Sequence, residues 1–233
     1  MKIYILTFCS FPVILIFSCA KDKYPLQMTD QKKAYSYLAL GDSYTIGQSV
    51  LASENFPSQT VQLLTQLSFN FKEPEIVAKT GWTTDELQNN INSHSFTPPY
   101  DVVTLLTGVN NQYRGRAVDT YKPEFENLLK QAIQFAAGKA DHVIVLSIPD
   151  WGVTPFAAGR DRDQIAMEID EYNAANKLIS ENYKVNYVNI TPWTREAAND
   201  ISLLAADGLH PSPKEYKRWS EKLAEKIKAV IIQ

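Results

Sequence analysis

The sequence is poor in the residues that would support several common kinds of protein. It contains two cysteines, Cys9 and Cys19, in 233 residues, too few for the disulfide framework of a small secreted domain. Its 23 lysines and arginines against 26 acidic residues form no long basic block, so the electrostatic footprint of a nucleic-acid-binding protein is missing. We therefore expect a domain that is stabilised by its core and has no nucleic-acid partner.

Several chemical motifs are also missing. The sequence has no Gly-x-Ser-x-Gly, which argues against an α/β-hydrolase with its nucleophile elbow. It has no Walker loop, no dinucleotide fingerprint and no clustered set of metal ligands, so we expect neither a cofactor nor a metal ion. Only three histidines are present, His94, His142 and His210, and few candidates therefore exist for a catalytic base.

The N-terminal segment predicts export. Residues 3–17 form an almost uncharged run that is too short for a comfortable membrane span and is typical of a signal peptide. The residues Ile-Phe-Ser-Cys at 16–19 resemble a bacterial lipoprotein processing site, which would make Cys19 the lipidated first residue. A plain secretory signal that is cleaved nearby is the alternative. We predict a signal peptide over residues 1–18, a tether over 19–33 and an exported lipoprotein of the bacterial cell envelope, at the outer membrane or cell surface.

The remaining residues, 34–233, are predicted to form one α/β domain. Short apolar segments of strand character alternate with longer segments of helical periodicity. The predicted strands cover residues 37–40, 74–78, 101–107, 142–147 and 185–190. Helices are expected to start at residues 56 and 83 and to span 121–137, 164–182 and 213–232. This alternation predicts a three-layer α/β/α sandwich with a five-stranded parallel sheet, similar to flavodoxin.

The first predicted strand leads directly to the candidate nucleophile, Ser43. Residues 37–40 carry no charge, and Gly41 allows a tight turn at the carboxyl end of the strand, where ligand sites of open α/β sheets lie. A Gly-Asp-Ser turn alone is common, and Asp42 has the simpler interpretation of bonding to its own loop.

A candidate acid–base pair lies near the other end of the chain. Asp207 and His210 are three residues apart in a loop with glycine and proline, just before the last predicted helix. At this spacing the carboxylate can accept a hydrogen bond from one nitrogen of the imidazole, while the other nitrogen of the ring faces a serine. His94 lies in a loop before the third predicted strand, and His142 is the first residue of the fourth. Both are expected at the end of the sheet opposite Ser43 and are expected to be structural.

Four blocks in this order resemble the GDSL esterase/lipase family, part of the SGNH hydrolase superfamily. They are Gly41-Asp42-Ser43, Gly81, Gly108-Val109-Asn110-Asn111, and Asp207 with His210. The resemblance implies a catalytic triad of Ser43, Asp207 and His210. It also implies an oxyanion hole formed by the backbone N–H groups of Ser43 and Gly81 and the side-chain amide of Asn110. Asn111 stands where the family usually has aspartate, which leaves open how this loop is supported.

The resemblance implies a monomeric serine esterase that acts on short-chain carboxylic esters, with O-acetyl groups on carbohydrate slightly favoured. Alternatives are a lysophospholipase or thioesterase of the same family, a non-catalytic ligand-binding module, and a flavin or phosphate binder on a similar sheet. Trp151 and Phe156 lie in a Pro/Gly-rich loop and are candidates for the substrate-pocket wall. Arg114 and Arg116 could meet an anionic substrate group or be solvated.

Overall fold

The computed structural model describes residues 1–3 and 33–232. Cys19 and nearly all of the predicted signal peptide and tether lie outside these described residues. Within the described part of the chain, no helix is long and apolar enough to cross a membrane.

Among the described residues, five parallel strands form one sheet in the order β2-β1-β3-β4-β5, which confirms the predicted fold class. The strands are β1 (Tyr37–Gly41), β2 (Glu75–Ala78), β3 (Val102–Leu106), β4 (Val143–Leu146) and β5 (Asn186–Val188). Every residue of β1, β3 and β4 is buried. This burial explains their charge-free sequences, because both faces of the sheet are covered.

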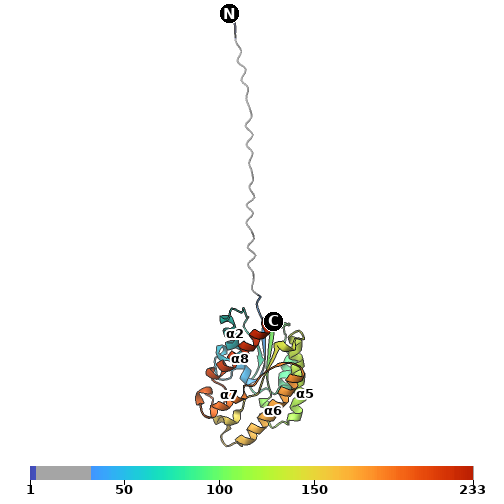
Figure 1. The fold of residues 1–233 in the computed structure, drawn as a ribbon, viewed down its shortest axis with the longest axis vertical. Coiled ribbons are helices and arrows are strands. Elements are labelled where there is room, and N and C mark those ends of the chain that lie inside the picture. Colours follow the sequence, from blue (N-terminus) through green and yellow to red (C-terminus); the bar gives the residue numbers. More distant parts are fainter. Residues whose placement is uncertain (4–32, 233) are drawn as a thin grey trace. The chain divides into compact units, whose positions relative to one another are not determined.

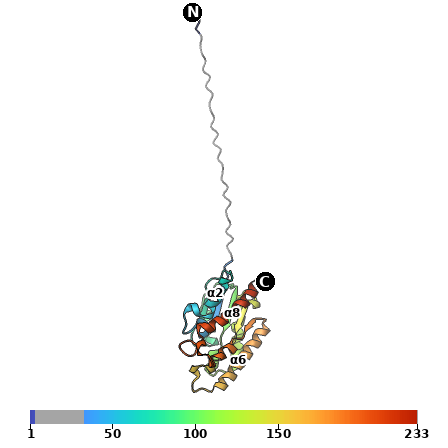
Figure 2. The ribbon, with the colours of Figure 1, turned by 60° about the vertical axis from the view of Figure 1, so that its left-hand side comes forward.

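Helices cover the two faces of the sheet. Figures 1 and 2 show α2 and α8 together on one face, and Figure 1 shows α5 and α6 together on the other. The long helices are α2 (Phe56–Gln66), α3 (Thr84–Ser93), α5 (Val118–Phe135), α6 (Arg162–Asn182) and α8 (Pro213–Ile231). Three short helices, α1 (Ser43–Ile46), α4 (Val109–Tyr113) and α7 (Thr191–Arg195), follow strands β1, β3 and β5.

The packing of α8 on α2 illustrates how the core forms. Tyr216, Trp219 and Leu223 recur at helical spacing along α8 and are fully buried. The ring of Phe56, the first residue of α2, lies 6.4 Å from that of Tyr216 and 6.1 Å from that of Trp219, measured between centroids. Aromatic rings of this size contribute much of the apolar area that a core buries.

Some predicted boundaries were wrong by a few residues. Helix α6 begins at Arg162 rather than at residue 164, because the Asp161 side chain accepts a hydrogen bond from the Gln164 amide and caps the helix there. Helix α5 begins three residues before its predicted start, at Val118. A four-residue helix that was not predicted, α1, begins at Ser43 and precedes α2.

The strand register brings three loops to one edge of the sheet. Gly41, the last residue of β1, pairs with Ala78 at the end of β2 and with Leu106 at the end of β3. The segments that follow these strands therefore leave the sheet side by side. They carry the candidate residues Ser43, Gly81 and Asn110.

Candidate active site

Ser43 lies at the carboxyl end of β1, where the chain turns into α1. The residue is 4% exposed and therefore buried. The preceding Asp42 is fully buried and caps α1, because its Oδ1 accepts a hydrogen bond of 3.0 Å from the backbone N–H of Tyr44. Burial raises the pKa of Asp42 to about 7, although the Tyr44 N–H acts in the opposite direction. Asp42 therefore forms the predicted hydrogen bond within its own turn.

His210 and Asp207 form a close pair. His210 Nδ1 lies 2.7 Å from Asp207 Oδ2, and Asp207 Oδ1 accepts from the backbone N–H groups of Leu209 and His210 at 3.0 Å each. The Ser49 hydroxyl also donates to Asp207 Oδ2, at 2.7 Å. Partial burial would raise the pKa of Asp207, but the hydrogen bonds from Ser49, His210 and the backbone outweigh it and lower this pKa to about 2. Asp207 is thus held ionised beside the imidazole.

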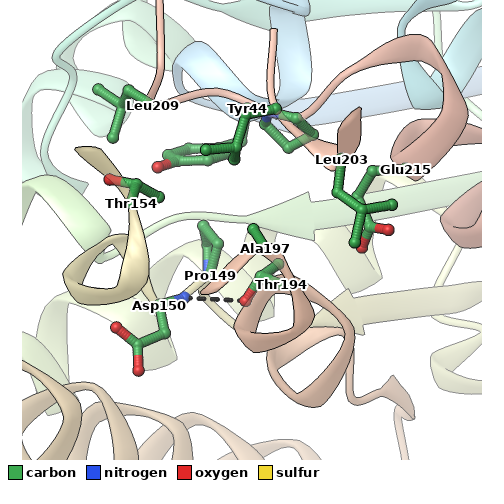
Figure 3. A pocket seen from close by; sticks show the side chains of 11 residues that line it. Tyr44, Pro149, Asp150, Thr154, Thr194, Ala197, Leu203, Leu209 and Glu215 are labelled. Atoms are coloured by element: carbon green, nitrogen blue, oxygen red, sulfur yellow. Dashed lines mark hydrogen bonds between the residues drawn. The ribbon is translucent and has the colours of Figure 1, made fainter. Parts of the chain in front are cut away.

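The imidazole of His210 is nearly buried, and its position is fixed by packing. The ring of Tyr44, the residue after Ser43, lies 4.9 Å from the His210 ring between centroids. Tyr44 also borders a small cavity that is lined by Thr154, Leu203 and Leu209 (Figure 3). This cavity has a volume of only about 10 Å³, enough for roughly one water molecule. It therefore supports the site rather than offering room for a substrate.

Gly81 lies on the loop after β2, and Asn110 lies in α4, the short helix after β3. Gly81 has a φ of +84°, and Gly108, which precedes α4, has a φ of +126°. A Cβ atom at Gly108 would lie 2.7 Å from the Tyr121 ring, so only glycine fits there. The Asn110 side-chain N–H₂ donates to the Trp82 carbonyl at 3.0 Å and lies 3.5 Å from Asp42 Oδ2. Both of its hydrogens therefore already have partners, although the second contact is long.

One cleft brings most of the predicted residues together. Its lining includes Ser43, Gly81, Asn110, Trp151, Phe156 and His210, with Asp207 behind the histidine. The cleft has a volume of about 140 Å³. Within the described residues the Ser43 hydroxyl forms no hydrogen bond with His210, and such bonds often tighten only when substrate binds.

The sequence analysis missed other residues of this cleft. Tyr113 and Leu209 also line it, and Tyr113 packs edge-on against Trp151 with 5.2 Å between ring centroids. Ser49, which bonds to Asp207, was missed as well. The only signal in the sequence is that each lies close to a predicted site residue: Tyr113 to Asn110, Leu209 to His210 and Ser49 to Ser43.

Asn111 answers the question that the sequence left open. It is fully buried, its Oδ1 accepts from the Thr84 backbone N–H at 3.0 Å, and its Nδ2 donates to the Thr84 hydroxyl at 2.6 Å. The same Nδ2 lies 3.4 Å from Glu124 Oε2, to which the Thr84 hydroxyl also donates. The asparagine therefore ties the loop after β3 to the start of α3.

The two arginines beside this loop contact protein carboxylates. Arg114 binds both oxygens of Glu86 at 3.1 Å and donates to the Gly81 carbonyl at 2.7 Å. Arg116 binds Asp85 at 2.6 Å. Both arginines therefore bind the first turn of α3, and Arg114 also holds the loop that carries Gly81.

The other two histidines lie at the amino end of the sheet. His94 Nε2 lies 3.0 Å from Glu75 Oε1 at the start of β2. His142 Nδ1 lies 2.6 Å from the Asp101 carbonyl, just before β3. Both therefore lie away from Ser43, as expected. Among the described residues, no group of three or more histidine, cysteine, aspartate or glutamate side chains is arranged to hold a metal ion.

Comparisons with known proteins identify the family of the chain. The model of the GDSL-like lipase/acylhydrolase family matches residues 39–218. The match covers most of the chain, which therefore belongs to this family and is a hydrolase. No relative was found among curated protein sequences.

Solved structures share the fold at low sequence identity. A lipase/acylhydrolase from Enterococcus faecalis matches with a TM-score of 0.66 and 18% identity, over 84% of this chain and 96% of that chain. The psychrotrophic esterase EstA from Pseudoalteromonas sp. matches with a TM-score of 0.64 and 17% identity, over 85% and 99%. Axe2, an acetylxylan esterase from Geobacillus stearothermophilus, matches with a TM-score of 0.65 and 18% identity, over 84% and 96%.

Proposed function

We propose that this protein is a serine esterase that hydrolyses short-chain carboxylic esters through an acyl-enzyme on Ser43. The proposal rests on one observation: a single cleft is lined by Ser43, Gly81, Asn110 and His210, and Asp207 lies within hydrogen-bond distance of Nδ1 of that histidine. A nucleophile, a base oriented by a carboxylate and nearby hydrogen-bond donors are the components that acyl transfer requires.

The reaction would proceed in two halves. His210 Nε2 takes the proton of the Ser43 hydroxyl as Oγ attacks the ester carbonyl, and it then gives that proton to the leaving alcohol. Water attacks the acyl-enzyme in the same way and releases the acid. Asp207 stabilises the imidazolium in both halves, and its lowered pKa of about 2 keeps it ionised at neutral pH.

The negative charge of the tetrahedral intermediate needs hydrogen-bond donors. We assign these to the backbone N–H groups of Ser43 and Gly81 and to the side-chain amide of Asn110. The Asn110 hydrogen directed at Asp42 has the weaker contact, because Nδ2 lies 3.5 Å from Asp42 Oδ2 and only 3.0 Å from the Trp82 carbonyl oxygen. It is therefore the one that can turn towards the oxyanion. Losing one such donor costs about 3 kcal/mol of transition-state stabilisation.

The natural substrate is proposed to be an O-acetyl ester on carbohydrate. The catalytic cleft is small, and its aromatic wall suits a compact ester rather than a long acyl chain. The structural similarity to an acetylxylan esterase supports the same choice. Lysophospholipase and thioesterase activities use the same chemistry and are distinguished by the test below.

The test combines active-site labelling with a substrate panel. A fluorophosphonate should modify Ser43 in the wild type and should not modify the Ser43→Ala variant, while Ser49→Ala should still be labelled. Hydrolysis of acetylated sugars should exceed that of lysophospholipids and acyl thioesters, and it should disappear in Ser43→Ala. Full activity of Ser43→Ala would refute the mechanism, and a protein that is neither labelled nor active would be a binding module instead.

We further propose that the enzyme acts in the bacterial cell envelope as a lipoprotein anchored through Cys19. The support is the sequence of residues 1–19 alone. Stable anchoring needs more than one acyl chain or a second membrane signal, and bacterial lipoproteins carry several chains. The enzyme would then meet esters outside the cytoplasm.

A further inference from the structure

A second cleft lies next to the catalytic one. It has a volume of about 240 Å³ and shares Tyr113 and Trp151 with the catalytic cleft. These two rings therefore form a ridge with one cleft on each side. Its other lining residues include Gln112, Arg160, Gln164 and Glu168.

A fixed hydrogen-bond network lines this second cleft. Trp151 Nε1 donates to Gln112 Oε1 at 2.7 Å, and Gln112 Nε2 donates to Glu168 Oε2 at 2.7 Å. Gln164 Nε2 donates to the other oxygen of Glu168 at 2.8 Å. The Glu168 carboxylate is thus held in place by two amides and keeps lone pairs free for further donors. A ligand would meet a carboxylate that needs little reorganisation on binding.

Arg160 and Tyr113 provide a donor and an apolar surface at the same cleft. The Arg160 guanidinium lies 5.9 Å from the centroid of the Tyr113 ring, and Tyr113 is 43% exposed. Within the described part of the chain, Arg160 forms no ion pair. By contrast, Arg114, Arg116, Arg195 and Arg218 all bind carboxylates. The donors of Arg160 are therefore available to a ligand.

The charges of the cleft narrow the choice of ligand. Asp161 and Glu168 give two carboxylates against one guanidinium, so an anionic ligand would be repelled overall. An alkyl chain would leave the polar groups of the cleft without water or partners. Hydroxyl groups can donate to Glu168 and accept from Arg160 at once, and the C–H face of a sugar ring can pack on the electron-rich face of Tyr113.

We propose that the second cleft binds an uncharged sugar ring, adjacent to the sugar whose ester lies in the catalytic cleft. This inference rests on the proposed esterase function for its kinetic consequence, but not for binding itself. The ridge of Tyr113 and Trp151 touches both rings and sets their separation. The enzyme would then prefer acetylated oligosaccharides to acetylated monosaccharides.

The kinetic test compares an acetylated methyl xyloside with the matching acetylated xylobiose. We expect kcat/KM to be about tenfold higher for the disaccharide, mainly through KM, the gain that one good hydrogen-bonded contact provides. Arg160→Gln should reduce this ratio to about twofold or less. Lys139→Gln removes the same charge from an exposed loop that precedes β4, at the opposite end of the sheet, and should keep the full ratio.

A binding test keeps the proposal independent of catalysis. Unesterified xylobiose is titrated into the wild type and the two variants by calorimetry, with a disaccharide that contains a uronic acid as the charged comparison. We expect xylobiose to bind more tightly than the charged sugar, and Arg160→Gln to weaken its binding about tenfold. No binding of xylobiose, or equal binding by Arg160→Gln and wild type, would overturn the proposal. Absence of any ester hydrolysis would instead refute the proposed function. The calorimetry would then still decide whether the second cleft binds a sugar.

Discussion

Replacing Arg114 by glutamine tests whether the loop that carries Gly81 is positioned for catalysis. Arg114 Nη2 donates to the Gly81 carbonyl at 2.7 Å, while the same guanidinium binds both oxygens of Glu86. The next carbonyl along the chain, that of Trp82, accepts from Asn110. Gly81 has a φ of +84° and no side chain to restrict it. Without Arg114 its peptide groups can rotate, and its N–H can turn away from the oxyanion.

The magnitude of the effect follows from the exposure of the pair. Complete loss of an oxyanion donor costs about 3 kcal/mol, which sets the upper limit. Arg114 and Glu86 are 42% and 37% exposed, so solvent reduces the charge-assisted bond to about 1 kcal/mol. We therefore expect Arg114→Gln to lower kcat about fivefold with little change in KM. Arg114→Lys, which keeps the charge but not the two-pronged geometry, should fall between variant and wild type.

Arg116→Gln is the matched control. Arg116 binds Asp85, the residue before Glu86 in α3, at 2.6 Å but does not contact Gly81. Its kcat on p-nitrophenyl acetate should stay within about twofold of wild type, because a half-exposed ion pair contributes little to stability or geometry. Thermal unfolding of both variants checks that each is folded. Equal kcat values for the two variants would refute a positioning role of Arg114.

Three further outcomes are expected. Burial raises the pKa of Asp42 from 3.8 to about 7, so the wild type loses stability as pH rises between these values. Over that pH range the free energy of unfolding of Asp42→Asn, measured in urea, should rise relative to that of the wild type by on the order of 4 kcal/mol. A difference between the two proteins that does not change with pH would contradict this. Across p-nitrophenyl esters, kcat/KM should peak at acetate or butyrate, whereas a deep channel would add about 0.8 kcal/mol per methylene and favour palmitate. Cys19→Ser should move the protein out of the membrane fraction. Mass spectrometry that finds an unmodified N-terminus in the wild type would contradict the prediction.

The fold was predictable because its signals are local. The strands β1, β3 and β4 are buried on both faces and carry no charge, and α8 shows a clear apolar stripe. His210 and Asp207 lie three residues apart in one loop, so their pairing also depends on local geometry. The convergence of Ser43, Gly81 and Asn110 followed from one topological rule, since parallel strands end at the same edge.

The supporting contacts could not be predicted, because they join residues that are far apart in the sequence. Ser49 and Asp207 are 158 residues apart in the chain, and Arg114 and Gly81 are 33 apart. Periodicity assigns a residue to a face, but a hydrogen bond needs two side chains placed within a few tenths of an ångström. The two arginines looked equally free in the sequence, yet in the structure both bind carboxylates of α3 and only Arg114 also reaches Gly81. The second cleft combines α4, the loop after β4 and α6, and no motif spans these elements.

Asn111 shows how a departure from a family pattern can be compensated elsewhere. An aspartate at this position could accept from the Thr84 N–H as Asn111 does, but it could not donate to the Thr84 hydroxyl or to Glu124. Glu124 already supplies the carboxylate that accepts from that hydroxyl. A second carboxylate beside it would be a buried like charge and would oppose ionisation of both groups. The amide at Asn111 and the carboxylate at Glu124 therefore act as one unit, and the loop that presents Asn110 keeps its support.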